Sequence, residues 1–216
     1  MAPTAGEIIS QEERDILQEL MNIAFGNATA DLAQVIDIYV QLSVPNIQVV
    51  AINELSDYLK DAIDSDSKSS IVEQKFWGSF QGSGLLVFPS GSGMDLLALL
   101  NEKDSPGEST DKIPMDLIEK GGLLEISNIL IGACIGKFSE LLSTFVTYSP
   151  PQVFHGNSNE CESFINAFNP SQTAIVMKTV FDFQDKNVSG FLLILSSYES
   201  MDWLRKALHD FLESYE

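Results

Sequence analysis

The sequence repeats itself after a shift of 106 positions, and this internal repeat restricts the chain to folds built from two similar halves. The positions that align are Glu19, Asn22, Ile23, Gly26, Val40, Ser43 and Pro45 with Glu125, Asn128, Ile129, Gly132, Val146, Ser149 and Pro151. One residue further along, the segment 93–100 lies over the segment 200–208. Because the match extends over almost the whole of each half, it indicates an internal duplication.

The duplication predicts how the chain is divided. Residues 1–104 and 113–216 are predicted to be two pseudo-repeats within a single domain that spans 1–216. Between them, residues 101–114 are polar, contain Pro106 next to a glycine and show no hydrophobic period, as expected of a connector.

Composition and charge exclude several classes of protein. The net charge is formally −19 with only twelve Lys plus Arg, so a nucleic acid or an anionic membrane would repel the chain. The sequence has neither the N-terminal pattern of an export signal nor an apolar run of about 20 residues, the length that spans a bilayer. Its two cysteines, Cys134 and Cys161, show no spacing typical of a metal site or a disulfide framework. We therefore expect a cytoplasmic protein that binds no metal of its own, no nucleic acid and no membrane.

Hydrophobic periodicity predicts the same order of elements in each half: helix, helix, strand, helix, hairpin, helix. In the first half, Ser10 and Glu13 form a capping box before a helix over 11–25, which Gly26 and Asn27 are predicted to end. Later elements are expected near 32–39, 46–52, 55–63, 71–80 with 84–89, and 93–100, and in the second half near 138–145, 161–168, 174–183 with 190–195, and 200–208. This order is typical of an α+β fold of about six strands. We expect the halves to share one central sheet with pseudo-two-fold symmetry, and some helices to be exposed.

A glutamate and an asparagine one turn apart stand out inside a predicted helix of each half. Asp15, Glu19 and Asn22 are spaced four and three residues apart, so they lie along one helix face. Asn in a helix interior costs about 0.5 kcal/mol or more relative to Ala, because its amide competes with the backbone for hydrogen bonds. A single such Asn would be explained by a bond to a neighbouring element. Glu125 and Asn128 repeat the pair, and the repetition favours a functional role.

The chemistry open to this pair is narrow, because no histidine, metal-ligand cluster or basic pocket accompanies it in the sequence. A carboxamide cannot take a proton from water, so Asn22 and Asn128 are poor general bases. They can instead hold and orient a water molecule, as carboxamides do at phosphoryl-transfer sites where other groups supply the cations. Glu19 and Glu125 would then pair with a lysine of a partner and fix the register of the asparagine.

The spacing of these residues resembles the signature of the CheC/CheX/FliY phosphatases of bacterial and archaeal chemotaxis. That signature reads Asp or Ser, three residues, Glu, two residues, Asn, twenty-two residues, Pro. The residues Asp15, Glu19, Asn22 and Pro45 satisfy every position of it.

The second half matches the signature at all positions except the first. Glu125, Asn128 and Pro151 are present, but Gly121 stands where the acid or serine is expected. Two E-x2-N pairs in one chain are similar to CheC rather than CheX, in which only one half keeps the pair. The chain ends at Glu216 without the extra C-terminal region of FliY, so the resemblance favours CheC over a flagellar-switch subunit.

The resemblance implies a phosphatase that removes the phosphoryl group from the aspartate of a CheY-type response regulator. The implied catalytic residues are Asn22 and Asn128, the implied docking residues are Asp15, Glu19 and Glu125, and the implied structural residues, at the start of a strand, are Pro45 and Pro151. The enzyme would need no cofactor of its own, because the regulator carries the Mg²⁺. The resemblance also implies CheD, a receptor-modifying deamidase, as a second partner, although no residue identifies that contact.

Gly121 lies beside Gly122, and these residues distinguish the second site from the first. Each interior glycine costs up to about 1 kcal/mol, so we expect the second site helix to start late or fray. We therefore expect Asn22→Ala to remove more activity than Asn128→Ala. The alternative to an enzyme is a binding module that holds a regulator or CheD on the same helix faces and hydrolyses nothing. The sequence leaves open which regulator is used, whether the two sites act independently and whether the protein self-associates.

Overall fold

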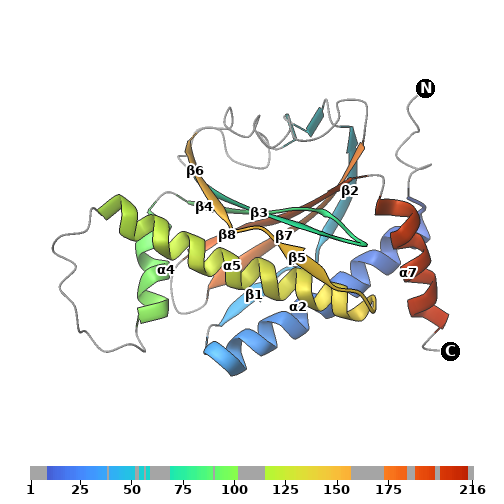
Figure 1. Cartoon of the computed structure of the whole chain (residues 1–216), viewed down its shortest axis with the longest axis horizontal. Coiled ribbons are helices and arrows are strands. Elements are labelled where there is room, and N and C mark those ends of the chain that lie inside the picture. Colours follow the sequence, from blue (N-terminus) through green and yellow to red (C-terminus); the bar gives the residue numbers. More distant parts are fainter. Residues whose placement is uncertain are drawn as a thin grey trace.

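The computed structural model of the chain shows helices packed against a large twisted sheet (Figure 1). The residues that it describes are 9–37, 39–51, 54–55, 57–58, 69–89, 91–101, 115–156, 173–183, 188–197 and 200–213. The connector after Asn101, the helix predicted near 161–168 and the turn at 184–187 lie outside this set. Of the helix predicted over 55–63, residues 55, 57 and 58 are described, and they are helical.

One antiparallel sheet contains all the described strands. Their bounds are β1 (Val40–Leu42), β2 (Asn46–Ala51), β3 (Ser69–Gly78), β4 (Gly82–Pro89), β5 (Val146–Tyr148), β6 (Gln152–Gly156), β7 (Thr173–Phe183) and β8 (Val188–Ser197). The strand order is β1-β7-β8-β4-β3-β5, with β2 also paired to β7 and β6 to β3. The expectation of about six strands is therefore wrong, because the three-residue strands β1 and β5 are too short to show an alternating pattern.

The strand pairing exchanges elements between the two halves of the chain. The short strands β1 and β2 of the first half pair with β7 of the second, and β5 and β6 of the second half pair with β3 of the first. The two hairpins, β3–β4 and β7–β8, meet through the pairing of β4 with β8. The halves thus share one central sheet, as expected, and neither half completes that sheet alone.

The described helices are fewer and longer than the sequence predicted. Their bounds are α2 (Gln11–Ile36), α4 (Ser92–Asn101), α5 (Met115–Leu141) and α7 (Met201–Glu213). The predicted break at Gly26 and Asn27 is wrong, because α2 continues through both residues, and α5 likewise replaces two predicted helices of the second half. The repeat of helix, helix, strand, helix, hairpin, helix is thereby corrected, since its first two helices are one.

Packing explains why the glycine does not end α2. An interior glycine costs about 1 kcal/mol relative to Ala, whereas burying one large apolar side chain contributes about 1.5–3 kcal/mol. Met21, Phe25 and Ala28 around Gly26 are all buried against the core. The helix ends instead at Asp37, which adopts a left-handed conformation with φ 53° and donates its N–H to the Leu32 carbonyl.

The long helices α2 and α5 lie side by side on one face of the sheet, with α4 packed on α5 and α7 on α2 (Figure 1). The main core lies between these helices and the strands, where Val72 and Phe76 of β3 are buried. Ile71 projects to the opposite face and joins a second buried cluster with Leu55. The alternation along β3 therefore matches the period of a strand that is covered on both faces.

The helix α5 is apolar over most of its length. The segment Leu117–Leu141 is long and apolar enough to cross a membrane by length and composition, because a stretch of 18 residues within it has a mean hydropathy of 1.3. Half of it (50%) is buried inside the protein, and the central helix of a soluble core has the same composition. Packing against the sheet, α2 and α4 accounts for this apolar character.

Candidate functional site on two neighbouring helices

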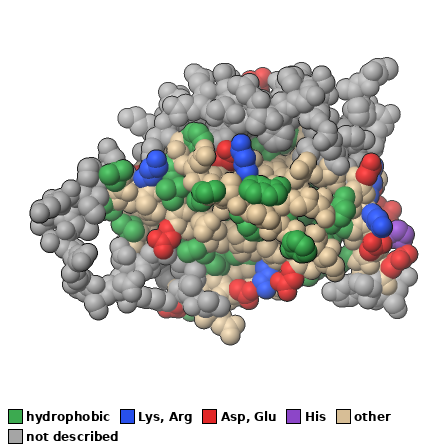
Figure 2. All heavy atoms as spheres, in the orientation of Figure 1, with side chains coloured by type: hydrophobic (Ala, Val, Ile, Leu, Met, Phe, Trp, Pro, Cys, Tyr) green, Lys and Arg blue, Asp and Glu red, His purple; other side chains and the backbone are tan. Residues whose placement is uncertain are grey.

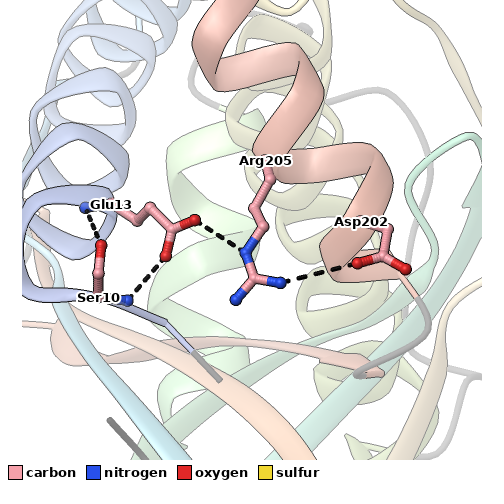
Figure 3. A network of polar contacts seen from close by, with 4 residues as sticks. All are labelled: Ser10, Glu13, Asp202 and Arg205. Atoms are coloured by element: carbon pink, nitrogen blue, oxygen red, sulfur yellow. Dashed lines mark hydrogen bonds and ion pairs between the residues drawn. The ribbon is translucent and has the colours of Figure 1, made fainter. Parts of the chain in front are cut away.

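The N-terminus of α2 is fixed by the predicted capping box and by a contact from α7 (Figure 3). The Glu13 N–H donates to Ser10 Oγ at 3.1 Å, and the Ser10 N–H donates to Glu13 Oε2 at 2.7 Å. Arg205 donates its Nε–H to Glu13 Oε1 at 2.8 Å and lies 3.7 Å from Asp202. Burial alone would raise the pKa of Glu13, but the hydrogen bonds to Ser10 and the Arg205 guanidinium outweigh it and lower that pKa.

The first candidate site lies along the solvent-facing side of α2. The side chains of Asp15, Glu19 and Asn22 are exposed, whereas Leu20 and Met21 between them are buried. In the part of the chain that the structure describes, no hydrogen bond involves the Asn22 amide. The first site therefore presents a carboxylate and a free carboxamide one turn apart.

The second candidate site has the same two side-chain types, one turn apart, on α5. Glu125 and Asn128 are exposed, and Ile126 and Ser127 between them are buried. Each candidate site thus consists of a carboxylate and an amide on the exposed face of a long helix, available to another protein.

The expectation that α5 starts late is wrong, because α5 begins at Met115 and runs through both glycines without interruption. Gly121 is exposed with open space around it. Gly122 is buried, and a Cβ added there would lie 2.5 Å from the Gly93 carbonyl oxygen of α4 and 3.0 Å from Leu97 Cβ. Gly122 therefore permits close packing of α4 on α5, which the sequence alone did not indicate.

The two site helices are also joined by charge. Lys137 of α5 forms an ion pair with Asp31 of α2 at 2.8 Å and with Glu140 at 3.1 Å, and these contacts raise the pKa of Lys137. Figure 2 shows the side of the molecule seen in Figure 1, where hydrophobic side chains lie between scattered charged ones. Among the exposed hydrophobic residues, Ile23 lies directly beside Asn22. The face thus combines acidic, amide and apolar groups, a mixture suited to contact with another protein.

The two motif prolines lie directly before strands, as predicted. Pro45 is buried and precedes β2, while Pro151 is half-buried and precedes β6. Two residues before each proline, a serine bonds a central strand: the Ser43 N–H donates to the Val180 carbonyl at 2.9 Å, and the Ser149 N–H donates to the Lys75 carbonyl at 2.9 Å. The two serines attach these segments to the central strands β7 and β3.

A residue that the sequence analysis missed contacts the second site. Gln74 of β3 is buried (2% exposed) and donates Nε2–H bonds to Asn128 Oδ1 at 2.7 Å and to the Ser149 carbonyl at 3.0 Å. Gln74 and Asn128 are 54 positions apart, so no local spacing indicated the contact. Alternation along β3 could place Gln74 on the helix-facing side of the sheet, but only the fold shows which helix residue it meets.

The titratable groups beneath α5 are not suited to proton transfer at neutral pH. Tyr148 donates its hydroxyl to the Gly132 carbonyl at 3.4 Å, and burial, followed by the neighbouring Cys134, raises its pKa to about 12. Burial also raises the pKa of the Cys134 thiol. Within the described ranges, no three His, Cys, Asp or Glu side chains lie together in a way that could hold a metal ion. The exposed polar groups of the two candidate sites are their carboxamides and carboxylates.

Comparison with known proteins shows which proteins the chain resembles. Residues 12–48, which cover α2 except Gln11, the strand β1 and the start of β2, match the model of the CheC-like family. A protein of Bacillus subtilis (strain 168) named "CheY-P phosphatase CheC" is 24% identical over 204 residues, which cover 93% of this chain and 95% of the relative. The protein named "Flagellar motor switch phosphatase FliY" from the same organism is 24% identical over 145 residues, 67% of this chain and 36% of that longer protein.

Solved structures share the fold. Thermotoga maritima FliY superimposes with a TM-score of 0.67 at 20% identity, covering 96% of this chain and 99% of that one. The FliM middle domain from H. pylori superimposes with a TM-score of 0.57 at 12% identity, covering 92% and 99%. The family match, the relatives and the shared mixed fold of helices and antiparallel sheet together confirm that the chain resembles the CheC/CheX/FliY family.

Proposed function

We propose that the protein is a phosphatase that hydrolyses the phosphoaspartate of a CheY-type response regulator in cytoplasmic chemotaxis signalling. The observation that carries the proposal is the pair of exposed carboxylate and carboxamide side chains one turn apart on each of two neighbouring helices. The relative named as a CheY-P phosphatase supports the same assignment at 24% identity. CheD as a second partner stays a prediction from the family resemblance.

In the proposed reaction, Asn22 or Asn128 holds a water molecule in line with the acyl phosphate of the docked regulator. The water oxygen attacks phosphorus as the bond from phosphorus to the aspartate oxygen breaks, so the products are inorganic phosphate and a free aspartate carboxylate. The regulator's Mg²⁺ neutralises the phosphoryl charge. Proton removal needs no base on this protein, because the water proton can leave with the phosphate.

The carboxylates are proposed to bind rather than to react. A negative charge beside the phosphoryl group would raise the barrier, so Glu19 and Glu125 are assigned to pairing with a basic side chain of the regulator. Asp15 extends the acidic stripe at the first site, while Gly121 leaves the equivalent place in the second site without a side chain. We accordingly propose two copies of one site, produced by an internal duplication of residues 1–104 and 113–216.

A regulator phosphorylated with a small acyl phosphate, mixed with the purified protein, tests the proposal directly. The double variant Asn22→Ala with Asn128→Ala is expected to abolish the accelerated loss of phosphate, while Glu19→Ala and Glu125→Ala are expected to raise KM. Asn27→Ala is the matched control, because Asn27 is an exposed asparagine of α2 outside the site. Unchanged phosphate decay with the parent protein would refute the phosphatase. Tight binding without hydrolysis would favour the alternative, a non-catalytic module for a regulator or CheD.

A further inference from the structure

In the second site, two hydrogen bonds of the buried Gln74 amide connect the Ser149 backbone carbonyl to the Asn128 amide. We call this set of contacts the amide relay. Gln74 donates one Nε2–H to the Ser149 carbonyl and the other to Asn128 Oδ1. A carbonyl oxygen can only accept, so the Ser149 carbonyl determines that Gln74 presents its NH₂ group rather than its oxygen. The same NH₂ group then requires Asn128 to present its oxygen in return.

The relay therefore fixes the orientation of the exposed Asn128 amide. Since its oxygen faces Gln74, its own NH₂ group lies on the other side of the planar amide. Oδ1 has two lone pairs, and Gln74 occupies one of them, so the second can still accept a hydrogen bond from a water molecule. Gln74 Oε1 is buried without a partner among the described residues, so the two donated bonds hold this side chain in place within that part of the chain.

The first site has a threonine in the place of Gln74. In the second half, the Ser149 Oγ accepts the Lys75 N–H at 3.0 Å, and Lys75 follows Gln74. In the first half, the Ser43 Oγ accepts the Val180 N–H at 2.9 Å, and Val180 follows Thr179. Gln74 and Thr179 therefore occupy equivalent positions on their central strands.

Thr179 makes only the first of the two hydrogen bonds that Gln74 makes, the one to the serine carbonyl. Its hydroxyl donates to the Ser43 carbonyl, as Gln74 donates to the Ser149 carbonyl. The side chain of Thr179 ends there, and no hydrogen bond among the described residues involves the Asn22 amide. The two sites thus share the serine contact and differ in whether the amide is held.

We propose that Gln74 is a positioning residue for Asn128, and that it makes the two sites inequivalent. This inference rests on the proposed function. The Asn128 amide is already oriented, so the second site can order the attacking water without a further loss of side-chain entropy. The Asn22 amide can rotate freely, so it must be fixed each time a regulator docks. The second site accordingly has the higher kcat, which reverses the ranking expected from Gly121 alone.

The test compares Gln74 variants in two single-site backgrounds. Asn22→Ala leaves only the second site, and Asn128→Ala leaves only the first. Gln74→Thr copies the residue of the first site and keeps a hydroxyl for the Ser149 carbonyl, while Gln74→Met keeps the chain length and removes both donors. In the Asn22→Ala background, either change is expected to lower kcat about tenfold, the effect of one lost hydrogen bond, with KM unchanged.

The same Gln74 variants in the Asn128→Ala background decide whether the loss of kcat is specific to the second site. With Asn128→Ala present, the Gln74 variants are expected to leave kcat unchanged. Equal losses in both backgrounds, or no loss in either, would overturn the assignment of Gln74. Equal kcat values for Asn22→Ala and Asn128→Ala alone would also contradict the inequivalence.

A spectroscopic measurement separates this inference from the proposed function. In the parent protein, the side-chain NH₂ protons of Gln74 are expected to exchange slowly with solvent, and Asn128→Ala is expected to shift their NMR signals while Asn22→Ala is not. Fast exchange, or identical spectra with and without Asn128, would overturn the relay. If the parent hydrolyses no acyl phosphate, the phosphatase fails, and this measurement still decides whether Gln74 orients Asn128.

Discussion

Two adjacent glycines of α5 predict opposite effects of the same substitution. At Gly121 an added Cβ meets nothing within 4 Å, so Gly121→Ala gains helix propensity and should stabilise the protein by about 0.5–1 kcal/mol. At Gly122 the added Cβ would lie 2.5 Å from the Gly93 carbonyl oxygen. That oxygen belongs to the backbone of α4, so the helices must separate, and such overpacking costs about 1–3 kcal/mol.

Helix propensity offsets part of the cost at Gly122. Alanine gains about 1 kcal/mol there too, so the expected net result of Gly122→Ala is a loss of up to about 2 kcal/mol. Urea unfolding followed by circular dichroism measures both variants, and a change in midpoint at constant slope reports stability alone. The reasoning is refuted if the two substitutions shift the midpoint in the same direction. A stabilised Gly122→Ala would show that α4 does not approach α5 as closely as the structure has it.

Three further outcomes test other parts of the structure. Gly26→Ala should stabilise α2 by about 0.5–1 kcal/mol, because Gly26 lies within a continuous helix with open space around it, and a loss in thermal unfolding would contradict that continuity. The pKa of Glu13 is lower in the folded state, so its contribution is present above the ordinary value of 4.5 and is lost as pH falls through the folded pKa. Glu13→Gln should therefore lower the free energy of unfolding by about 1 kcal/mol at pH 7. In urea unfolding, the difference in this free energy between variant and parent should shrink below pH 4.5. A difference that stays constant with pH would contradict the Arg205 contact. Cys134 is fully buried and burial raises its pKa, so iodoacetamide should label it only after unfolding, and rapid labelling of the native protein at that residue would contradict its position.

The parts of the fold that the sequence predicted are those specified by local signals. The capping box at Ser10, the hairpins of the central sheet and the strand after Pro45 each depend on residues a few positions apart. The prediction failed where packing between distant segments decided the outcome. The helix-propensity cost of Gly26 favours a helix end, but the burial of its helix neighbours outweighs that cost.

The candidate site shows the same division between local and distant information. The exposed carboxylates and amides follow from helical spacing, which needs only the sequence around Asn22 and Asn128. Neither Gln74 beneath Asn128 nor the contact of Gly122 with α4 could be predicted in this way, because their partners lie far away in the sequence. Both contacts involve α5, the helix of the second candidate site, and only the fold shows them.

The pairing of strands between the two halves places Gln74 and Thr179 at equivalent junctions of the sheet. The strand β7 of the second half pairs with β2, which follows the helix α2 of the first half. The strand β3 of the first half pairs with β6, which follows the helix α5 of the second half. Gln74 and Thr179 both bond the serine carbonyl at that junction, so either residue satisfies the shared architecture. Only the longer side chain also reaches the asparagine above it. We therefore expect a substitution between these two types to change the order of one asparagine amide while the sheet keeps its connection.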